Sequence, residues 1–249
     1  EDVNQKFDKI LKITNENQLS EEDIFKITNI NQVVMTNNPF NSEEKKILNL
    51  NKDSKYLPSI RIDDLFMKPK SKKEYLNSWY LSDHEKIKKA IKEIKIIIQT
   101  NKPSYFSLST ENFKEFENEF FFKNFLSLLK ETKTPMMLLI GVKRGVNKLY
   151  NDAGDGIGTM NLDYLEKILS KFPGNKFLVS CLDYRDQFKL SVLARKFQNL
   201  KIVGFWWFNN NESIIENLLK QRFELLGDNF IVQHSDARII DQLVYKWLD

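Results

Sequence analysis

The sequence predicts an α/β protein built as a (β/α)8 TIM-like barrel, with seven of the eight strands visible in this chain. Short apolar runs of strand length alternate with amphipathic segments of helix length, which is the pattern of parallel βα units. The runs are almost continuously apolar, as expected of strands that are buried on both faces. The length of 249 residues is typical of one such barrel.

Seven apolar runs are the candidate strands. They cover residues 32–36, 58–63, 105–109, 136–142, 176–182, 201–207 and 229–235. Helical patterns follow the later runs, at residues 162–172, 188–197 and 214–226, and a closing helix is expected over 239–247. A doubly wound sheet could also hold seven strands, whereas a closed barrel needs eight.

The first 31 residues predict a helical lead-in without a strand. Ser20 precedes three acidic residues, which favours it as the N-cap of a helix. We therefore expect residues 1–249 to form a single barrel domain that is truncated at its N-terminus and lacks its first strand. Such a sheet would have unpaired edges, so we expect an open or patched barrel that associates into a homo-oligomer.

Composition and charge exclude several classes of protein. The 38 basic and 34 acidic residues nearly balance, and the basic residues neither cluster nor alternate with aromatic ones, so no nucleic-acid partner is expected. No apolar stretch approaches the roughly 20 residues that span a bilayer, so no membrane partner is expected. The single cysteine, Cys181, indicates a reducing compartment and a cytoplasmic location.

Polar residues follow several candidate strands, at the positions where barrels place reactive groups. Arg61 falls inside an apolar run, where an unpaired charge is costly. Asp236 and Arg238 are two residues apart, so in an extended chain both face the same way. An aspartate there can bind a metal or move a proton, and an arginine can hold a carboxylate. The alternative is an Asp236–Arg238 pair that caps the final helix.

Two adjacent tryptophans, Trp206 and Trp207, stand in the stretch "GFWWFNNNES". Successive residues of a strand point to opposite faces, so the two indoles cannot share one role. The segment 153–158, "AGDGIG", lacks the preceding strand and the lysine of a phosphate loop. We expect it to be a flexible loop over the mouth of the barrel that could act as a lid.

The stretches "MMLLIGVKRGVN", "AGDGIG", "FLVSCL", "GFWWFNNNES" and "HSDARIIDQLVYKW" together resemble uronate (glucuronate) isomerases. These enzymes are (β/α)8 barrels of the amidohydrolase superfamily. "VVMTNNPF" and "SIRIDDLF" are similar to the family's second and third strands, so the resemblance covers nearly the whole chain. It implies the isomerisation of an aldose uronate, such as D-glucuronate, to the ketose D-fructuronate.

The resemblance also implies roles for single residues. Asp236 matches the aspartate at the end of the eighth strand, which binds a divalent metal, expected to be zinc, and is a candidate for proton transfer. Arg238 and Arg61 match arginines that contact the sugar acid, a hexuronate. Trp206 and Trp207 match the family's double tryptophan: one indole lines the sugar pocket, for which we expect Trp207, and the other packs outward against helices.

One departure from the family leaves the activity of this chain open. The family carries a His-x-His metal-binding pair on its first strand, but this chain contains only His84 and His234. Metal binding and turnover are therefore in doubt, even if the parent fold is that of an isomerase. Two alternatives stand beside the isomerase: a metal-dependent hydrolase of a sugar-acid ester or lactone, and a non-catalytic sugar-acid-binding remnant.

Overall fold

The computed structural model describes residues 19–50, 53–66, 80, 83–111, 119–232, 234, 236–237, 239–240 and 242–247. The chain divides into two compact units. The larger unit consists of residues 34–234, and the smaller one combines residues 1–33 with 235–249.

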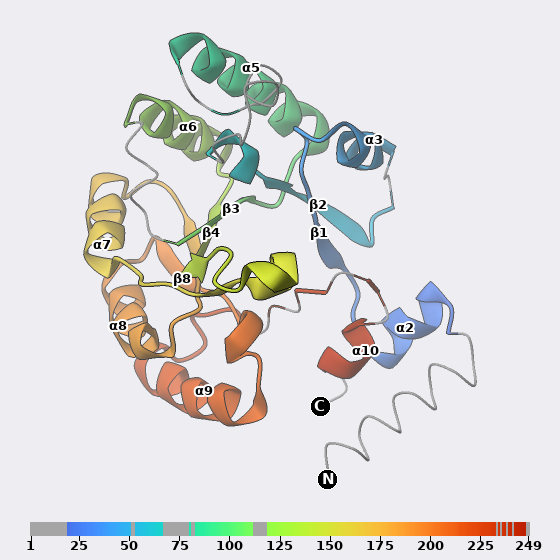
Figure 1. The fold of residues 1–249 in the computed structure, drawn as a ribbon, viewed down its shortest axis with the longest axis vertical. Coiled ribbons are helices and arrows are strands. Elements are labelled where there is room, and N and C mark those ends of the chain that lie inside the picture. The colour runs from blue at the N-terminus through green and yellow to red at the C-terminus, as the bar shows by residue number, and fades with distance from the viewer. Residues whose placement is uncertain are drawn as a thin grey trace. The chain divides into compact units, whose positions relative to one another are not determined.

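A six-stranded sheet forms the centre of the larger unit, with the order β1-β2-β3-β4-β7-β8 (Figure 1). The strands are β1 Val33–Asn37, β2 Tyr56–Arg61, β3 Phe106–Thr110, β4 Met136–Ile140, β7 Phe177–Cys181 and β8 Leu200–Ile202. From β2 to β8 every neighbouring pair is parallel. Six of the seven predicted runs are thus strands. The described part of the seventh contributes a single parallel bridge, between Ile231 and Val203.

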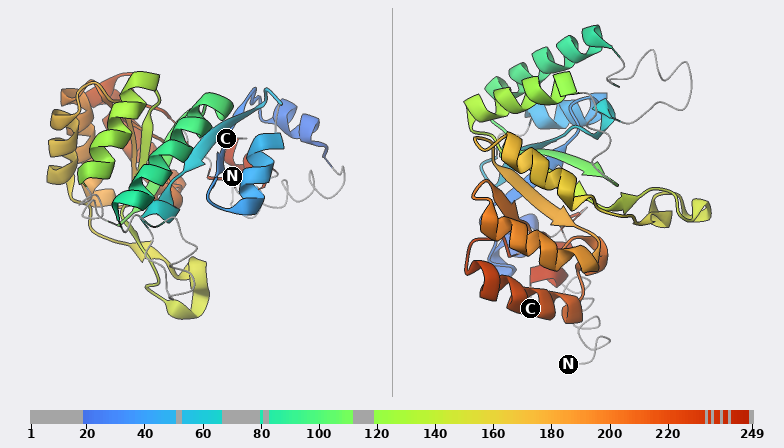
Figure 2. Two further views of the ribbon diagram at one scale, coloured as in Figure 1. Left: turned by 90° about the horizontal axis from the view of Figure 1, so that it is seen from above. Right: turned by 90° about the vertical axis from the view of Figure 1, so that its left-hand side faces the viewer.

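Helices connect the strands and cover one face of the sheet (Figures 1 and 2). They are α3 Ser42–Leu50, α5 His84–Asn101, α6 Glu119–Thr132, α7 Leu162–Lys171, α8 Gln187–Lys196 and α9 Glu212–Leu226. Asn161 and Asn211 cap α7 and α9, because the side chain of each accepts from a backbone N–H of the first turn. The three helices predicted within residues 162–226 are confirmed, each to within two residues of its observed ends.

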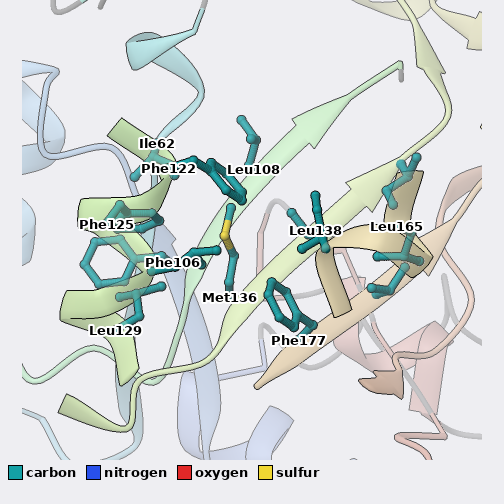
Figure 3. Packing of buried hydrophobic residues seen from close by; sticks show 14 of the residues in the cluster. Ile62, Phe106, Leu108, Phe122, Phe125, Leu129, Met136, Leu138, Leu165 and Phe177 are labelled. Carbon is teal, nitrogen blue, oxygen red and sulfur yellow. The ribbon is translucent and has the colours of Figure 1, made fainter. Parts of the chain in front are cut away.

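The core lies between the helices and the sheet. On the central strands, alternate residues point to the helices, and Figure 3 shows Phe106, Met136 and Phe177 among them. The ring of Phe106 meets that of Phe125 on α6 edge to face, 5.4 Å apart. Each fully buried large apolar side chain contributes roughly 1.5–3 kcal/mol. The intervening residues, such as Ser107, belong to the opposite face of the sheet.

A small antiparallel hairpin extends beyond the end of β4 (Figure 2). Its strands are β5 Val142–Lys143 and β6 Gly156–Ile157, separated by the 3-10 turn η3 Lys148–Gly154. The segment 153–158, expected as a flexible loop, instead ends this turn and pairs in the hairpin. The reason is local: Asp155 accepts from the backbone N–H of Gly145 at 2.8 Å, and this bond ties the two arms together.

The smaller unit contains the helices α2 Glu21–Ile27 and α10 Gln242–Trp247, which pack through Ile24, Leu243 and Val244. The predicted N-cap is confirmed, because Ser20 Oγ accepts from the N–H of Asp23 and Asp23 Oδ2 accepts from the N–H of Ser20. Residues 1–18 of the expected lead-in lie outside the described residues. In the described parts of the chain no helix is long and apolar enough to cross a membrane.

Candidate active site

The carboxyl ends of parallel strands meet at one edge of the sheet, where α/β proteins bind their ligands. In the larger unit this edge carries Arg61 as the last residue of β2, and Asp63 at the start of the 3-10 turn η1 Asp63–Leu65. Arg144 follows β5, and Trp206 and Trp207 follow β8. One part of this edge therefore carries positively charged side chains, and another part carries aromatic ones.

Asp63 connects the end of β2 to β3 and lies in the field of two arginines. The residue is 7% exposed, and Oδ1 accepts from the backbone N–H of Ser109 on β3 at 2.9 Å. Burial raises the pKa of Asp63, while the Ser109 N–H and the positive charges of Arg61 and Arg144 act against that rise. Both arginines thus lie within electrostatic range of one buried carboxylate. The sequence alone does not single out Asp63, whose only signal there is its position two residues after Arg61.

The environment of Arg61 differs from the prediction. Arg61 was expected inside an apolar strand, but it is the last residue of β2 and its side chain is exposed. The strand ends there because the chain turns into η1, so the guanidinium stays in water and avoids the desolvation that burial would impose. An exposed guanidinium at this edge is available to a ligand, and its role as a substrate contact stays a prediction.

Arg144 is fixed at the base of the hairpin. Its Nη1 donates to Asp155 Oδ2 at 2.5 Å. Burial acts to raise the pKa of Asp155, but the N–H of Gly145 and the Arg144 guanidinium outweigh it and lower that pKa. The hairpin therefore holds one arginine at a defined place beside the strand ends, within electrostatic range of Asp63.

The two tryptophans contact each other through their rings. Their rings are stacked, with centroids 5.4 Å apart and an angle of 10° between the planes. Trp206 is buried with Val142 and Leu182, and Trp207 packs beside this cluster. The prediction that the indoles point to opposite faces, one of them packing outward against helices, is therefore wrong.

The physical reason for this difference is the backbone. β8 ends at Ile202, and Trp207 begins the 3-10 turn η5 Trp207–Asn209 with a φ of 49°. Strand alternation does not apply in that conformation, which costs a non-glycine residue about 1 kcal/mol. Trp207 is the more exposed of the two indoles, and its expected contact with the sugar stays a prediction.

The predicted pair of Asp236 and Arg238 is described only in part. Arg238 lies outside the described residues, and Asp236 belongs to the smaller unit. Asp236 is exposed and has a φ of 47°, so it does not have the extended conformation in which it would face the same way as Arg238. Its proposed roles in proton transfer and metal binding stay predictions.

The described residues do not fit a divalent metal. Nowhere among them do three side chains of histidine, cysteine, aspartate or glutamate gather as a metal site, whereas zinc takes at least three protein ligands. The acidic groups of the edge are engaged otherwise, Asp63 with the N–H of Ser109 and Asp155 with Arg144.

This arrangement suits a small, anionic and polar ligand. Arginines bind a carboxylate through two parallel hydrogen bonds. An aromatic surface beside them gives the apolar wall that a ligand site also needs. The fold and the site together define an α/β protein with a largely parallel sheet, whose strand ends carry arginines on one part and an indole stack on another.

Comparison with known proteins finds similar solved structures. No family model and no curated protein matches the sequence. Among solved structures, the uronate isomerase from Bacillus halodurans C-125 is 34% identical, with a TM-score of 0.83. That similarity covers 99% of this chain and 61% of the other. The predicted resemblance to the uronate isomerase family, and with it the α/β fold of barrel type, is thereby confirmed.

A second similar structure is the uronate isomerase from Thermotoga maritima, at 17% identity and a TM-score of 0.72. The similarity covers 94% of this chain and 62% of that one, and at this identity it shows a shared fold. This chain thus spans about three fifths of the length of both enzymes.

Proposed function

We propose that the function is that of a uronate isomerase, interconverting D-glucuronate and D-fructuronate. The observation that carries this proposal is the 34% identity over 99% of the chain to the B. halodurans uronate isomerase. The edge of the sheet supports it independently, since two arginines act electrostatically on one buried carboxylate at the edge that also carries the tryptophan stack. A free and buried Cys181 agrees with the proposed location in the cytoplasm.

The reaction moves a proton between C2 and C1 of an open-chain sugar. It needs a group that removes and returns the proton, and a substrate held in one orientation while it does so. In the proposal Asp236 moves the proton, and Arg61 and Arg238 hold the distant carboxylate. Trp207, stacked on Trp206, forms the wall against which the sugar lies.

Turnover on this 249-residue chain tests the proposal. We expect D-glucuronate to be converted to D-fructuronate, and the Asp236→Asn protein to lose at least about a hundredfold in rate, as for a removed acid–base group. Metal content is measured on the same samples. Undiminished conversion by Asp236→Asn would contradict the role of Asp236. Release of acid from a uronate ester or lactone without isomerisation would favour the hydrolase alternative.

A second candidate is sugar-acid binding without turnover. The observation in its favour is that Arg61 and Arg144 both act electrostatically on Asp63 at the edge of the sheet. Arg61 and Arg144 need no metal to attract a carboxylate. Binding of D-glucuronate in the presence of a chelator, together with the absence of conversion, would support this candidate over the isomerase.

A further inference from the structure

A buried arginine stands behind the tryptophan stack. Arg222 on α9 is 2% exposed, and its Nη1 donates to the carbonyl oxygen of Gly204 at 3.0 Å. Its Nη2 donates to Gln187 Oε1, also at 3.0 Å, and Nε has no acceptor among the described residues. Burial lowers the pKa of Arg222 to about 10. Burying a cation whose hydrogen bonds go only to neutral oxygens carries a desolvation cost. Its presence here therefore points to a role in ordering the backbone that it contacts.

Arg222 also contacts the residues that precede Trp206 through an aromatic ring. Its guanidinium carbon lies over the ring of Phe205 at 4.5 Å from the centroid, and over that of Phe230 at 5.9 Å. Such cation–π contacts strengthen when both partners are buried. Arg222 therefore contacts both residues that lead into Trp206, the carbonyl of Gly204 and the side chain of Phe205.

The hydrogen bonds continue from Arg222 to the far end of the tryptophan segment. Gln187 Nε2 donates to the carbonyl oxygen of Cys181 at 2.7 Å. Asn209 Nδ2 donates to that same oxygen at 2.8 Å. Gly204 and Asn209 flank residues 205–208, so one connected network fixes both ends of the segment to the carboxyl end of β7.

The backbone of this segment needs such support. Gly204 has a φ of 42° and Trp207 a φ of 49°. Trp207 is a bulky residue in the left-handed region, a conformation that persists only where surrounding contacts determine it. The hydrogen bonds of Arg222, Gln187 and Asn209 lie at the two ends of the segment that contains Trp207.

We infer that Arg222 is a positioning residue: with Gln187 and Asn209 it holds the Trp206–Trp207 stack in the orientation in which Trp207 meets the substrate. The fixation of the stack is independent of the ligand. Its consequence, that sugar-acid affinity depends on Arg222 although Arg222 is buried behind the stack, rests on the proposed function.

Circular dichroism tests the first part, since two stacked indoles give a paired exciton signal that a general loss of stability does not mimic. The signal is defined as the difference between the wild-type protein and Trp207→Phe. We expect Arg222→Met to lose most of it while remaining folded. Lys220→Met is the matched control, because Lys220 is an exposed cation of the same helix, and the signal should persist. A folded Arg222→Met protein with the full signal would overturn the inference.

Arg222→Lys keeps the positive charge and serves if Arg222→Met does not fold. A single ammonium cannot copy the planar fork that spans Gly204 and Gln187, so a weakened signal is expected and an undiminished one would overturn the inference.

Binding of D-glucuronate tests the second part. We expect Arg222→Met to bind roughly fivefold to tenfold more weakly, the loss of about one aromatic contact. A lost stack with unchanged affinity would overturn the positioning role. If the wild-type protein binds no uronate at all, the proposed function fails, while the exciton signal still decides whether Arg222 holds the stack.

Discussion

At the residue scale, Asp63 shows how a buried carboxylate can join a site and still destabilise the fold. Its pKa is raised above the ordinary value near 3.8 because burial outweighs the Ser109 N–H and the two arginines. Between these two pKa values the folded protein holds a proton that the unfolded chain has released. The free energy of unfolding therefore falls as the pH rises through this window, and stays lower above it.

Replacing Asp63 by asparagine should stabilise the protein at neutral pH. Asparagine keeps an oxygen for the N–H of Ser109 and has no charge to desolvate. The measurement is the free energy of unfolding in urea at several pH values. We expect the gain of Asp63→Asn over the wild-type protein to vanish at acid pH, below the ordinary carboxyl pKa. Asp163→Asn is a control with the opposite sign, because its hydrogen bond with Lys189 lowers the pKa of Asp163. A less stable Asp63→Asn protein at neutral pH would contradict this account.

Cys181 should be unreactive in the folded protein. Its thiol is buried, and burial raises its pKa to about 12, so only about one molecule in ten thousand carries the thiolate at pH 8. We expect alkylation of the native protein to be negligible and alkylation in denaturant to be complete. Ser170→Cys, on the exposed side of α7, provides a reactive thiol for comparison. Rapid labelling of Cys181 in the native protein would show that this end of β7 opens.

At the element scale, the hairpin of β5 and β6 is held by its own contacts. A Cβ at Gly154 would lie 1.8 Å from the carbonyl oxygen of Asn147, which no side-chain movement can relieve. We expect Gly154→Ala to open the hairpin and to accelerate its cleavage in limited proteolysis. At Gly174 a Cβ would meet only the flexible end of Lys130, so Gly174→Ala should leave cleavage unchanged. Equal cleavage of both variants would contradict this description.

The regular elements could be predicted from the sequence because their patterns are strong. The helix expected at 162–172 is observed as Leu162–Lys171, since apolar residues recur with helical period and Asn161 caps its start. The Trp206–Trp207 turn could not be predicted. Its shape depends on a left-handed Trp207 and on Arg222, 15 residues along the chain, and neither leaves a periodic signal.

At the scale of the whole molecule, the sequence indicated which edge of the sheet would carry the site, but not which groups meet there. Asp63 reaches Ser109, 46 residues later, only because β2 and β3 are neighbours in the sheet. The roles of Asp236 and Arg238 rest on the family resemblance and stay predictions, as do the single truncated domain and the association of chains through sheet edges.

The most direct test of the central claim, that the cationic edge recognises a sugar acid, is calorimetric titration of this chain with D-glucuronate and with D-glucose. We predict binding of D-glucuronate at least about tenfold tighter than that of D-glucose, and loss of this preference in Arg61→Met. Arg195→Met, which removes an exposed charge from α8, should keep the preference. Equal affinity for both sugars, or a preference unchanged by Arg61→Met, would contradict the account.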